Sequence, residues 1–382
     1  MAAEPHLTLR TKVDGRKATW LELFYDLIYV IVIAKLAHHL THPPHPEISV
    51  ADYAKFVALF VPVWWAWTGH TLFANRFDPD DVPHRLLTLA QMFGAIVMAI
   101  FIEDAIGAGA AGFAAGYVFV RVLLVAMYAR VYLSAPELRG VAGRFMAGFS
   151  IGAAFWFASI FVDPPIRYQL WVLGLAVDFA TPWLSQRLLA KVSVHKSHLP
   201  ERLGLLAIIV LGESVLSIVD GLDGAQWSAN AIVAALAGFV LLASIWWLYF
   251  ESLERSLMGQ AFTSGQLTIY GHLPVYVGLV TVAAGIRQAI VPGIPVAEIG
   301  WLICGGLLLF LLPLQIIHGA RLPRSRLGGF LARNAALNVA IAGLGAVSAK
   351  VGPSGTMAVI SMIYLVYVVL ESRIGLVAGE PD

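Results

Sequence analysis

Long runs of apolar residues alternate with short polar connections along almost the whole chain, from Trp20 to Glu371. A helix needs about 20 mostly apolar residues to cross the roughly 30 Å hydrocarbon core of a bilayer. Twelve runs meet that requirement, so the pattern predicts an all-α, polytopic membrane protein. The predicted spans are residues 20–40, 53–74, 84–103, 113–133, 143–162, 168–188, 201–220, 229–250, 266–287, 298–318, 329–349 and 355–373.

The Lys and Arg residues in the connections and at the adjoining ends of the spans are distributed very unevenly. Nineteen of them lie in the N-terminal segment, at the even-numbered connections and at the end of the last span. The odd-numbered connections hold three, namely Arg167, Arg287 and Lys350. The positive-inside rule therefore places both termini in the cytoplasm. An even number of spans requires the same arrangement.

Weak matches recur at a spacing near 180 residues and predict two parallel six-helix repeats. Sites in such proteins gather at the interface between the repeats, although unrelated helix bundles can share such matches by chance. The matched residues are Glu22 and Glu201, Trp64-Trp65 and Trp246-Trp247, and Leu87-Thr88 and Leu267-Thr268. The predicted organisation is a cytoplasmic segment 1–19, a first repeat 20–188, a basic cytoplasmic linker 189–200, a second repeat 201–373 and a cytoplasmic tail 374–382.

Composition excludes several functional classes. The chain is 59% hydrophobic and 13% charged, with a mean hydropathy of +0.78, unlike a soluble domain. A net charge of +1 argues against nucleic-acid binding. The single cysteine, Cys304, permits neither an intramolecular disulfide nor a cysteine-based metal site. No nucleotide-binding, nucleophile-elbow or metalloprotease motif is present, so ATP-driven transport is not expected. We also expect no cofactor, no metal ion and no enzymatic activity.

Ionisable residues inside the spans are costly and are therefore the candidate functional residues. Glu22, Asp26 and Tyr29 fall at i, i+4 and i+7, on one face of the first span. Burial makes Asp26 a candidate proton carrier unless a cation holds it ionised. The alternative is an acid that bonds a neighbouring helix and staples the bundle.

Histidines and midplane charges extend this set. His70 and His272 can join Asp26 in a proton relay or line a vestibule, or can simply bond neighbouring helices. An Arg at the midplane needs a counter-ion, so Arg121 should form a structural ion pair with Asp178 or pair with Glu213.

Two further groups of polar residues, one leading outward from the midplane and one at the outer end of the first span, have competing interpretations. Glu213 shares a helix face with Ser217 and Asp220, which favours a lined path over a staple. Four histidines crowd the end of the first span. They can bind a divalent metal or sense external pH, but a hydrated polar loop is the simpler interpretation. These histidines are His38, His39, His42 and His45.

Three motifs resemble the bacterial low temperature requirement A (LtrA) family. They are Trp20-Leu-Glu-Leu-Phe-Tyr-Asp-Leu-Ile-Tyr-Val30, Glu201-Arg-Leu-Gly-Leu-Leu-Ala-Ile-Ile-Val-Leu-Gly-Glu-Ser214 and Tyr270-Gly-His-Leu-Pro274. The resemblance covers essentially the whole chain and implies a multi-pass protein of the bacterial inner membrane without an agreed biochemical activity. It marks six motif residues, which are Glu22, Asp26, Glu201, Glu213, Ser214 and His272.

These features favour a transporter or channel for an ion or small solute, with the lipid bilayer as its surroundings. One alternative is an intramembrane lipid-modifying enzyme, which requires Asp26, His70 and His272 to converge on a metal or on acid–base chemistry. Another is a membrane scaffold or sensor, in which the polar side chains are satisfied in pairs. The substrate and the oligomeric state are not encoded in any recognisable pattern.

Overall fold

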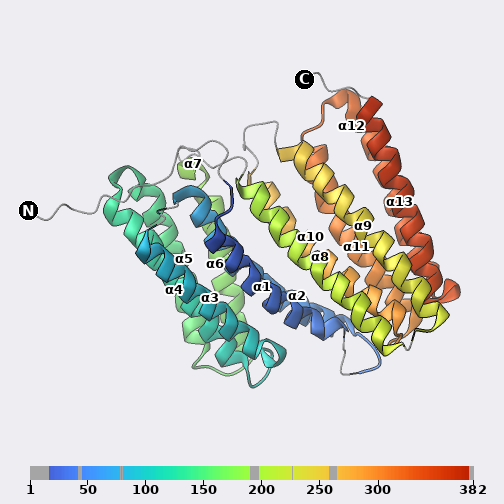
Figure 1. Cartoon of the computed structure of the whole chain (residues 1–382). Coiled ribbons are helices and arrows are strands. Elements are labelled where there is room, and N and C mark those ends of the chain that lie inside the picture. The colour runs from blue at the N-terminus through green and yellow to red at the C-terminus, as the bar shows by residue number, and fades with distance from the viewer. Residues whose placement is uncertain are drawn as a thin grey trace, which may run out of the picture. The chain divides into compact units, whose positions relative to one another are not determined.

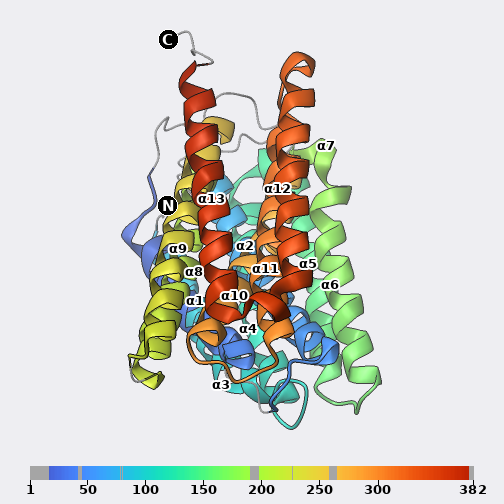
Figure 2. The same cartoon turned by 90° about the vertical axis from the view of Figure 1, so that its right-hand side faces the viewer.

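The computed structural model is built of helices, and no strand occurs within the described ranges 17–41, 45–77, 79, 81–189, 198–225, 227–257 and 265–377 (Figures 1 and 2). Within these ranges twelve long α-helices and one short α-helix follow one another, with two short 3₁₀ helices at Ile102–Asp104 and Pro136–Leu138. The α-helices are α1 (Trp20–Thr41), α2 (Val50–Phe77), α3 (Val82–Phe101), α4 (Ala110–Ser134), α5 (Arg139–Ser159), α6 (Ile166–Leu184), α7 (Gln186–Leu189), α8 (His198–Gly224), α9 (Ala229–Leu257), α10 (Gly265–Ile290), α11 (Val296–Gly319), α12 (Arg324–Val351) and α13 (Pro353–Val377).

Local side-chain chemistry defines where several helices begin and end. At the start of α1, the Thr19 hydroxyl accepts a hydrogen bond from the Glu22 backbone N–H, and the Glu22 carboxylate accepts one from Thr19 N–H. Ser49 and Asp52 form the same reciprocal capping box at α2. Between α12 and α13, Gly352 adopts a φ of 84°, a conformation that glycine accepts without strain.

Ten of the long helices are long and apolar enough to cross a membrane, by length and composition. Each predicted span overlaps one long helix, but the number of qualifying helices is ten instead of the predicted twelve. The other two are α1, which carries Glu22, Asp26 and Lys35, and α6, which has only 19 residues and carries Arg167 and Asp178. Polar side chains offset the hydrophobicity of these two helices.

The chain divides into two compact units. Unit 1 comprises Met1–Leu36 and Val57–Arg202, and unit 2 comprises Ala37–Phe56 and Leu203–Asp382. The first turn of α8 thus belongs to unit 1 and the remainder of that helix to unit 2. In the structure Leu189 ends α7 and His198 begins α8, so both ends of the predicted linker 189–200 fall in helices. Its residues 190–197, like the tail from 378 and the N-terminal residues 1–16, lie outside the described residues.

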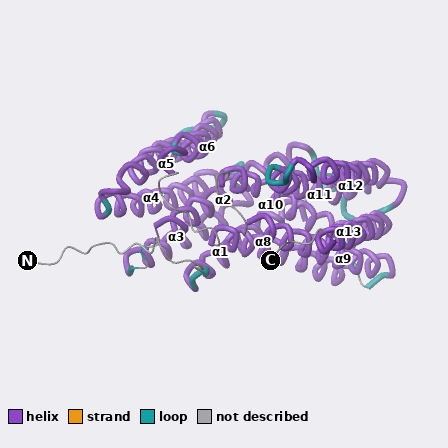
Figure 3. Tube along the Cα trace, turned by 90° about the horizontal axis from the view of Figure 1, so that it is seen from above, coloured by secondary structure: helices purple, strands orange, loops and turns teal. Residues whose placement is uncertain are grey.

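Within unit 1, consecutive helices pack as neighbours from α3 to α6 (Figure 3). An aromatic core joins α2, α4 and α5. There the Tyr128 ring packs edge-on against Phe73, with ring centroids 5.0 Å apart, and stacks on Phe145 at 5.2 Å. Trp65 of α2 stacks on Phe179 of α6 at 4.2 Å. These contacts make α2 a buried helix of the unit.

Within unit 2, α10 packs on α11, α11 on α12, and α9 on α13 (Figure 2). Small residues allow the α10–α11 approach, because a Cβ added at Gly278 would lie 2.5 Å from the Gly306 carbonyl oxygen. The end of α1 is held in this unit, where Arg287 and Gln288 of α10 both donate hydrogen bonds to the Thr41 carbonyl.

The two tryptophan pairs used to predict the internal repeat have different surroundings. Trp64 and Trp65 are buried within unit 1, whereas Trp246 and Trp247 in unit 2 are each about half exposed, at 49% and 52%. Packing accounts for the first pair, and contact with lipid suits the second. The repeat and the cytoplasmic placement of both termini therefore stay predictions.

The connection between α2 and α3 contains a polar clamp. Asp81 Oδ1 caps α3 by accepting a hydrogen bond from His84 N–H at 2.8 Å, and its Oδ2 lies 2.6 Å from Arg130 Nη2 of α4. Partial burial acts to raise the pKa of Asp81, but the hydrogen bonds from Arg130 and His84 outweigh it and lower the pKa. The clamp therefore favours the ionised carboxylate.

We predict that Asp81→Asn lowers the free energy of unfolding of the detergent-solubilised protein at pH 7 by less than about 1 kcal/mol, and lowers its melting temperature accordingly. The pKa of Asp81 in the folded state lies below its unfolded value of about 3.9. The stability that the ionised carboxylate contributes is therefore fully present above about pH 3.9 and is lost as the pH falls through the folded-state pKa. Melting curves from pH 7 downward should show the difference from wild type shrinking below about pH 3.9. Asp163→Asn is the control, because Asp163 is exposed. A difference in melting temperature between Asp81→Asn and wild type that does not change with pH would contradict the prediction.

Candidate functional site

Four ionisable side chains meet inside unit 1 where the first turns of α1 and α8 come together. Arg202 Nη2 lies 2.6 Å from Asp26 Oδ1, and Arg202 Nη1 lies 3.2 Å from Glu22 Oε1. His198 Nε2 lies 3.1 Å from the same Glu22 oxygen. All four side chains are buried. We call Glu22, Asp26, His198 and Arg202 the charge cluster.

Two side chains of α2 orient the charge cluster. Trp67 donates its indole N–H to Asp26 Oδ1 at 2.7 Å, and the Arg202 guanidinium lies 5.8 Å from the centroid of the Trp67 ring. The Asn75 amide nitrogen lies 3.1 Å from His198 Nδ1. Because an amide N–H donates, His198 Nδ1 accepts, and the imidazole proton is on Nε2, where it faces Glu22. This assignment fixes the direction of the hydrogen bonds through the cluster.

The charge cluster does not balance by itself when His198 is neutral. Two carboxylates then face one guanidinium, leaving a net charge of −1, and protonation of His198 makes the sum zero. Asp26 Oδ2 is buried and has no hydrogen-bond partner among the residues that the structure describes. A buried, unsatisfied carboxylate oxygen costs free energy, so this atom is a position where a proton, water or cation is stabilising.

A row of polar side chains continues from the charge cluster into unit 1. The hydroxyls of Tyr25 and Tyr29 are 3.2 Å apart, and the Tyr25 ring stacks on His70 with centroids 4.1 Å apart. Neither ring nitrogen of His70 makes a hydrogen bond of normal geometry within the described part of the chain, although Gln91 is near enough to interact. His84 lies 6.2 Å from His70, ring to ring.

The second buried ion pair joins α4 and α6. Arg121 Nη2 lies 3.1 Å from Asp178 Oδ2, and neither side chain is exposed. The Tyr117 hydroxyl lies between them, accepting from Arg121 Nε and Nη2 and donating to Asp178 Oδ2 at 2.7 Å. Tyr29 is close enough to interact electrostatically with Arg121. The structure thus brings Arg121 together with Asp178, while Glu213 lies in unit 2.

Glycines provide the space for this pair. A Cβ at Gly69 of α2 would lie 2.7 Å from Arg121 Nη1, and a Cβ at Gly152 of α5 would overlap the Asp178 carboxylate. The guanidinium also lies 5.0 Å from the centroid of the Tyr117 ring and 5.1 Å from that of Phe149. The pair is therefore tightly enclosed, as expected of a structural element.

The remaining sequence-predicted residues have more modest surroundings. Glu201, in unit 1, accepts the backbone N–H of Ala18 at 3.1 Å. In unit 2, Glu213 is half-buried on α8 while Ser214 and Ser217 are buried. His272 donates Nδ1–H to the Thr268 carbonyl of its own helix at 2.6 Å and packs between Tyr249 and Tyr276.

The metal-binding interpretations gain no support from the described residues. Throughout those ranges, no group of three or more His, Cys, Asp or Glu side chains is placed to hold a metal ion. His38 and His45 are exposed near the junction of α1 and α2, and His42 lies outside the described residues. Asp26 and His70 belong to unit 1, whereas His272 belongs to unit 2.

Comparison with known proteins establishes the family. The profile of the bacterial low temperature requirement A protein (LtrA) family matches residues 17–369. The chain belongs to the LtrA family. An uncharacterised protein of Rhizobium meliloti (strain 1021) is 28% identical over 304 residues, which cover 73% of this chain and 71% of that relative. As an LtrA-family member with ten helices of spanning length, the chain is a multi-pass membrane protein.

Sequence reasoning missed several residues of this LtrA-family site. Arg202, His198, Trp67, Asn75 and Tyr25 are not among the predicted site residues. Arg202 stands inside the second family motif, next to Glu201, and that position is the available signal. The charge count groups it with the cations of the connections because it is the second residue of the predicted span 201–220, whereas α8 begins at His198 and Arg202 lies a full turn inside it.

We predict that Arg202→Met destabilises the protein by about 3–5 kcal/mol, because it leaves two buried carboxylates without their cation. Lys35→Met is the matched control, since Lys35 forms an exposed ion pair with Glu103 in the same unit and should cost less than about 1 kcal/mol. Thermal unfolding in detergent compares the two variants. Equal losses of stability would show that the charge cluster is no more important than a surface pair.

We also predict that Gly69→Ala costs about 1–3 kcal/mol, because the added methyl group overlaps the Arg121 guanidinium and Leu124. Gly343→Ala on α12 is the control, since its Cβ would meet no atom within 4 Å. Helix propensity alone should make that control neutral or stabilising by up to about 1 kcal/mol. Identical melting temperatures for Gly69→Ala and wild type would contradict the enclosed geometry.

Proposed function

We propose that this LtrA-family protein is a transporter or channel for an ion or small solute in the bacterial inner membrane, with no enzymatic activity of its own. The proposal includes a duplicated architecture of two six-helix repeats with both termini in the cytoplasm. The main support is the series of buried polar side chains in unit 1. Soluble or scaffolding functions do not require such a series inside apolar helices.

Successive members of this series lie within hydrogen-bonding distance or within the range of electrostatic interaction. It begins at Glu22 and Asp26, passes through the Tyr25 and Tyr29 hydroxyls, and reaches Arg121 and Asp178. Hydroxyl and carboxyl groups in such an order can exchange protons or replace the hydration shell of a cation. Asp26 Oδ2 and Asp178 Oδ1 are both buried without a hydrogen-bond partner in the described ranges. Unsatisfied oxygens of this kind favour a role in binding protons or cations over a purely structural role.

A second polar stretch lies on α8 within unit 2. Glu213 is half-buried there, and one turn further the Ser217 hydroxyl is buried with no hydrogen-bond partner in the described parts of the chain. Glu213 and Asp26 stand on α8 and α1, the first helices of the two proposed repeats. We therefore propose a transport role for both side chains.

The two alternatives receive different support. The lipid-modifying enzyme needs Asp26, His70 and His272 at one centre, but Asp26 Oδ1 is bound by Arg202 and Trp67, and His272 Nδ1 is bound to its own helix. The scaffold is favoured by a specific observation, namely that the fully buried guanidiniums of Arg121 and Arg202 are both paired with carboxylates. Flux measurements separate transport from a scaffold.

We predict that purified protein in proteoliposomes conducts potassium, sodium or protons, and that Asp26→Asn and Glu213→Gln insert normally yet abolish the flux. Asp163→Asn and Glu47→Gln are the matched controls, because both side chains are exposed. Each substitution conserves shape and removes one charge. Ion-sensitive dyes and electrodes report the flux.

Two outcomes would count against the proposal. Flux unaffected by both variants would show that Asp26 and Glu213 are not on the path. No flux of any ion from well-folded wild-type protein would shift the balance to a non-ionic solute, lipid chemistry or a scaffold.

A further inference from the structure

Three arginines are buried among the described residues of unit 1, and they differ in how their charge is balanced. Arg121 and Arg202 are each paired with carboxylates. Arg76, in the last turn of α2, is only 8% exposed, yet it forms no ion pair with any residue that the structure describes. This buried positive charge therefore stands apart from the other two.

Hydrogen bonds do not replace the missing counter-ion of Arg76. Its Nη1 lies 3.5 Å from the Leu72 carbonyl of the same helix, which is a long contact, and its Nε is buried without a partner in the described ranges. Arg121 and Arg202 also lie over aromatic rings, an arrangement that Arg76 lacks within the same ranges. The C-terminal end of α2 supplies only a partial negative charge. A buried cation in this state is costly, so an anion from outside the chain would stabilise it.

A second donor without a described partner lies near Arg76. Tyr128 of α4 is close enough to this guanidinium to interact with it electrostatically. Packing against Phe73 and Phe77 fixes the Tyr128 ring, with centroids 5.0 and 5.7 Å apart. Its hydroxyl, however, makes no hydrogen bond with the residues that the structure describes. A guanidinium and a phenolic O–H are both donors, and together they favour an anionic ligand.

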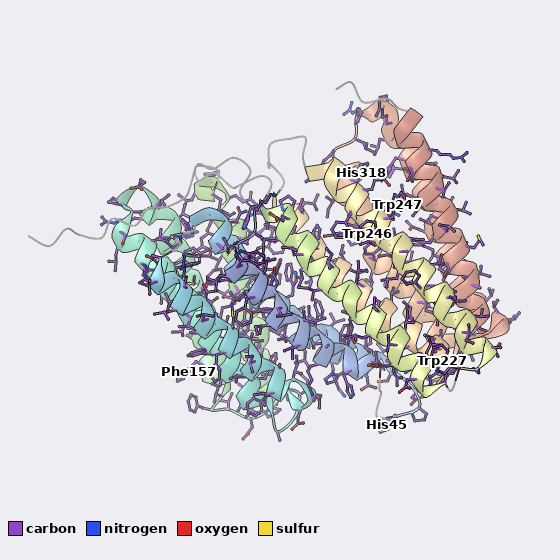
Figure 4. All side chains as sticks on the ribbon, viewed as in Figure 1. His45, Phe157, Trp227, Trp246, Trp247 and His318 are labelled. Atoms are coloured by element: carbon purple, nitrogen blue, oxygen red, sulfur yellow. The ribbon has the colours of Figure 1, made fainter. Side chains whose placement is uncertain are left out.

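The position of Arg76 along its helix indicates which anion is available. Val50–Phe77 is long and apolar enough to cross a membrane, and Arg76 is its penultimate residue, at the level of the lipid headgroups. Phe77 shares a buried apolar cluster with Val141 in the first turn of α5. Phe157, in the last turn of α5, lies toward the opposite end of the unit (Figure 4). The first turns of α5 also present the exposed Arg139 and Arg144, which add positive charge at the end where Arg76 lies.

Phosphate is the anion that suits this arrangement. The planar guanidinium fork matches two oxygens of a phosphate group, and phosphates are concentrated at the headgroup level. Basic pockets between membrane-spanning helices bind phospholipid headgroups in this way. We propose that Arg76, assisted by the Tyr128 hydroxyl, binds a phosphate group, carried by an anionic phospholipid or supplied as inorganic phosphate. Neither residue belongs to the proposed transport path, so the site stands whether or not the protein transports ions.

The proposal predicts opposite responses for two buried arginines when phosphate is absent. Arg76→Met removes a charge that nothing compensates and should melt no lower than wild type. Arg202→Met removes a paired cation and should melt lower, because two carboxylates lose their partner. Thermal unfolding of the full-length, delipidated protein in a neutral, phosphate-free detergent compares the two variants with wild type.

Titration of the same samples measures the binding itself. Inorganic phosphate is compared with sodium chloride at equal ionic strength, and dioleoyl phosphatidylglycerol with the zwitterionic dioleoyl phosphatidylcholine. We expect a saturable rise in the melting temperature of wild type, with a half-saturating concentration that is about tenfold or more higher in Arg76→Met. Tyr128→Phe keeps the ring and removes the hydroxyl, so it should weaken binding by a smaller factor. Arg144→Gln is the control, because Arg144 is exposed at the same end of the unit.

The comparisons also distinguish the two sources of phosphate. Stabilisation by inorganic phosphate identifies the free ion as a ligand. Stabilisation by phosphatidylglycerol without an effect of inorganic phosphate identifies a lipid headgroup, and either result supports the proposal. No specific stabilisation by either compound would overturn it, as would equal stabilisation of Arg76→Met and wild type. The proposal also fails if Arg76→Met without phosphate melts well below wild type, because Arg76 would then have its counter-ion within the chain.

Discussion

A buried guanidinium cannot be left without its counter-ions, and this constraint organises the first unit. Arg202 is fully buried and is held by the carboxylates of Glu22 and Asp26. Removing these three charges from water is costly, and only close geometry compensates for it. The first turn of α8 is therefore fixed against α1, and Trp67 of α2 is fixed with them through its hydrogen bond to Asp26.

The same physical problem is solved differently at Arg121. There one carboxylate is supplemented by the Tyr117 hydroxyl and by aromatic faces on several sides, and a glycine of α2 admits the guanidinium. Aromatic quadrupoles and a hydroxyl thus supply what the second carboxylate supplies at Arg202. Both arrangements use α2, through Trp67 at Arg202 and through Gly69 at Arg121, and most of that helix is buried.

The helices were predictable because length and hydropathy are local properties of the sequence. The cost of burying a charge likewise marks Asp26, Arg121 and Asp178 from their positions within apolar runs. The partner of Asp26 was not predictable. Arg202 lies 176 residues away, and its position beside a basic connection is typical of an ordinary loop cation.

The burial of Arg202 also has a thermal consequence. Hydration of charged groups becomes more favourable as water cools, so the free energy needed to keep Arg202, Asp26 and Glu22 dry increases on cooling. Hydrophobic stabilisation weakens over the same range. The junction of α1 with the start of α8 is consequently a part of unit 1 whose stability should decline as the membrane becomes colder.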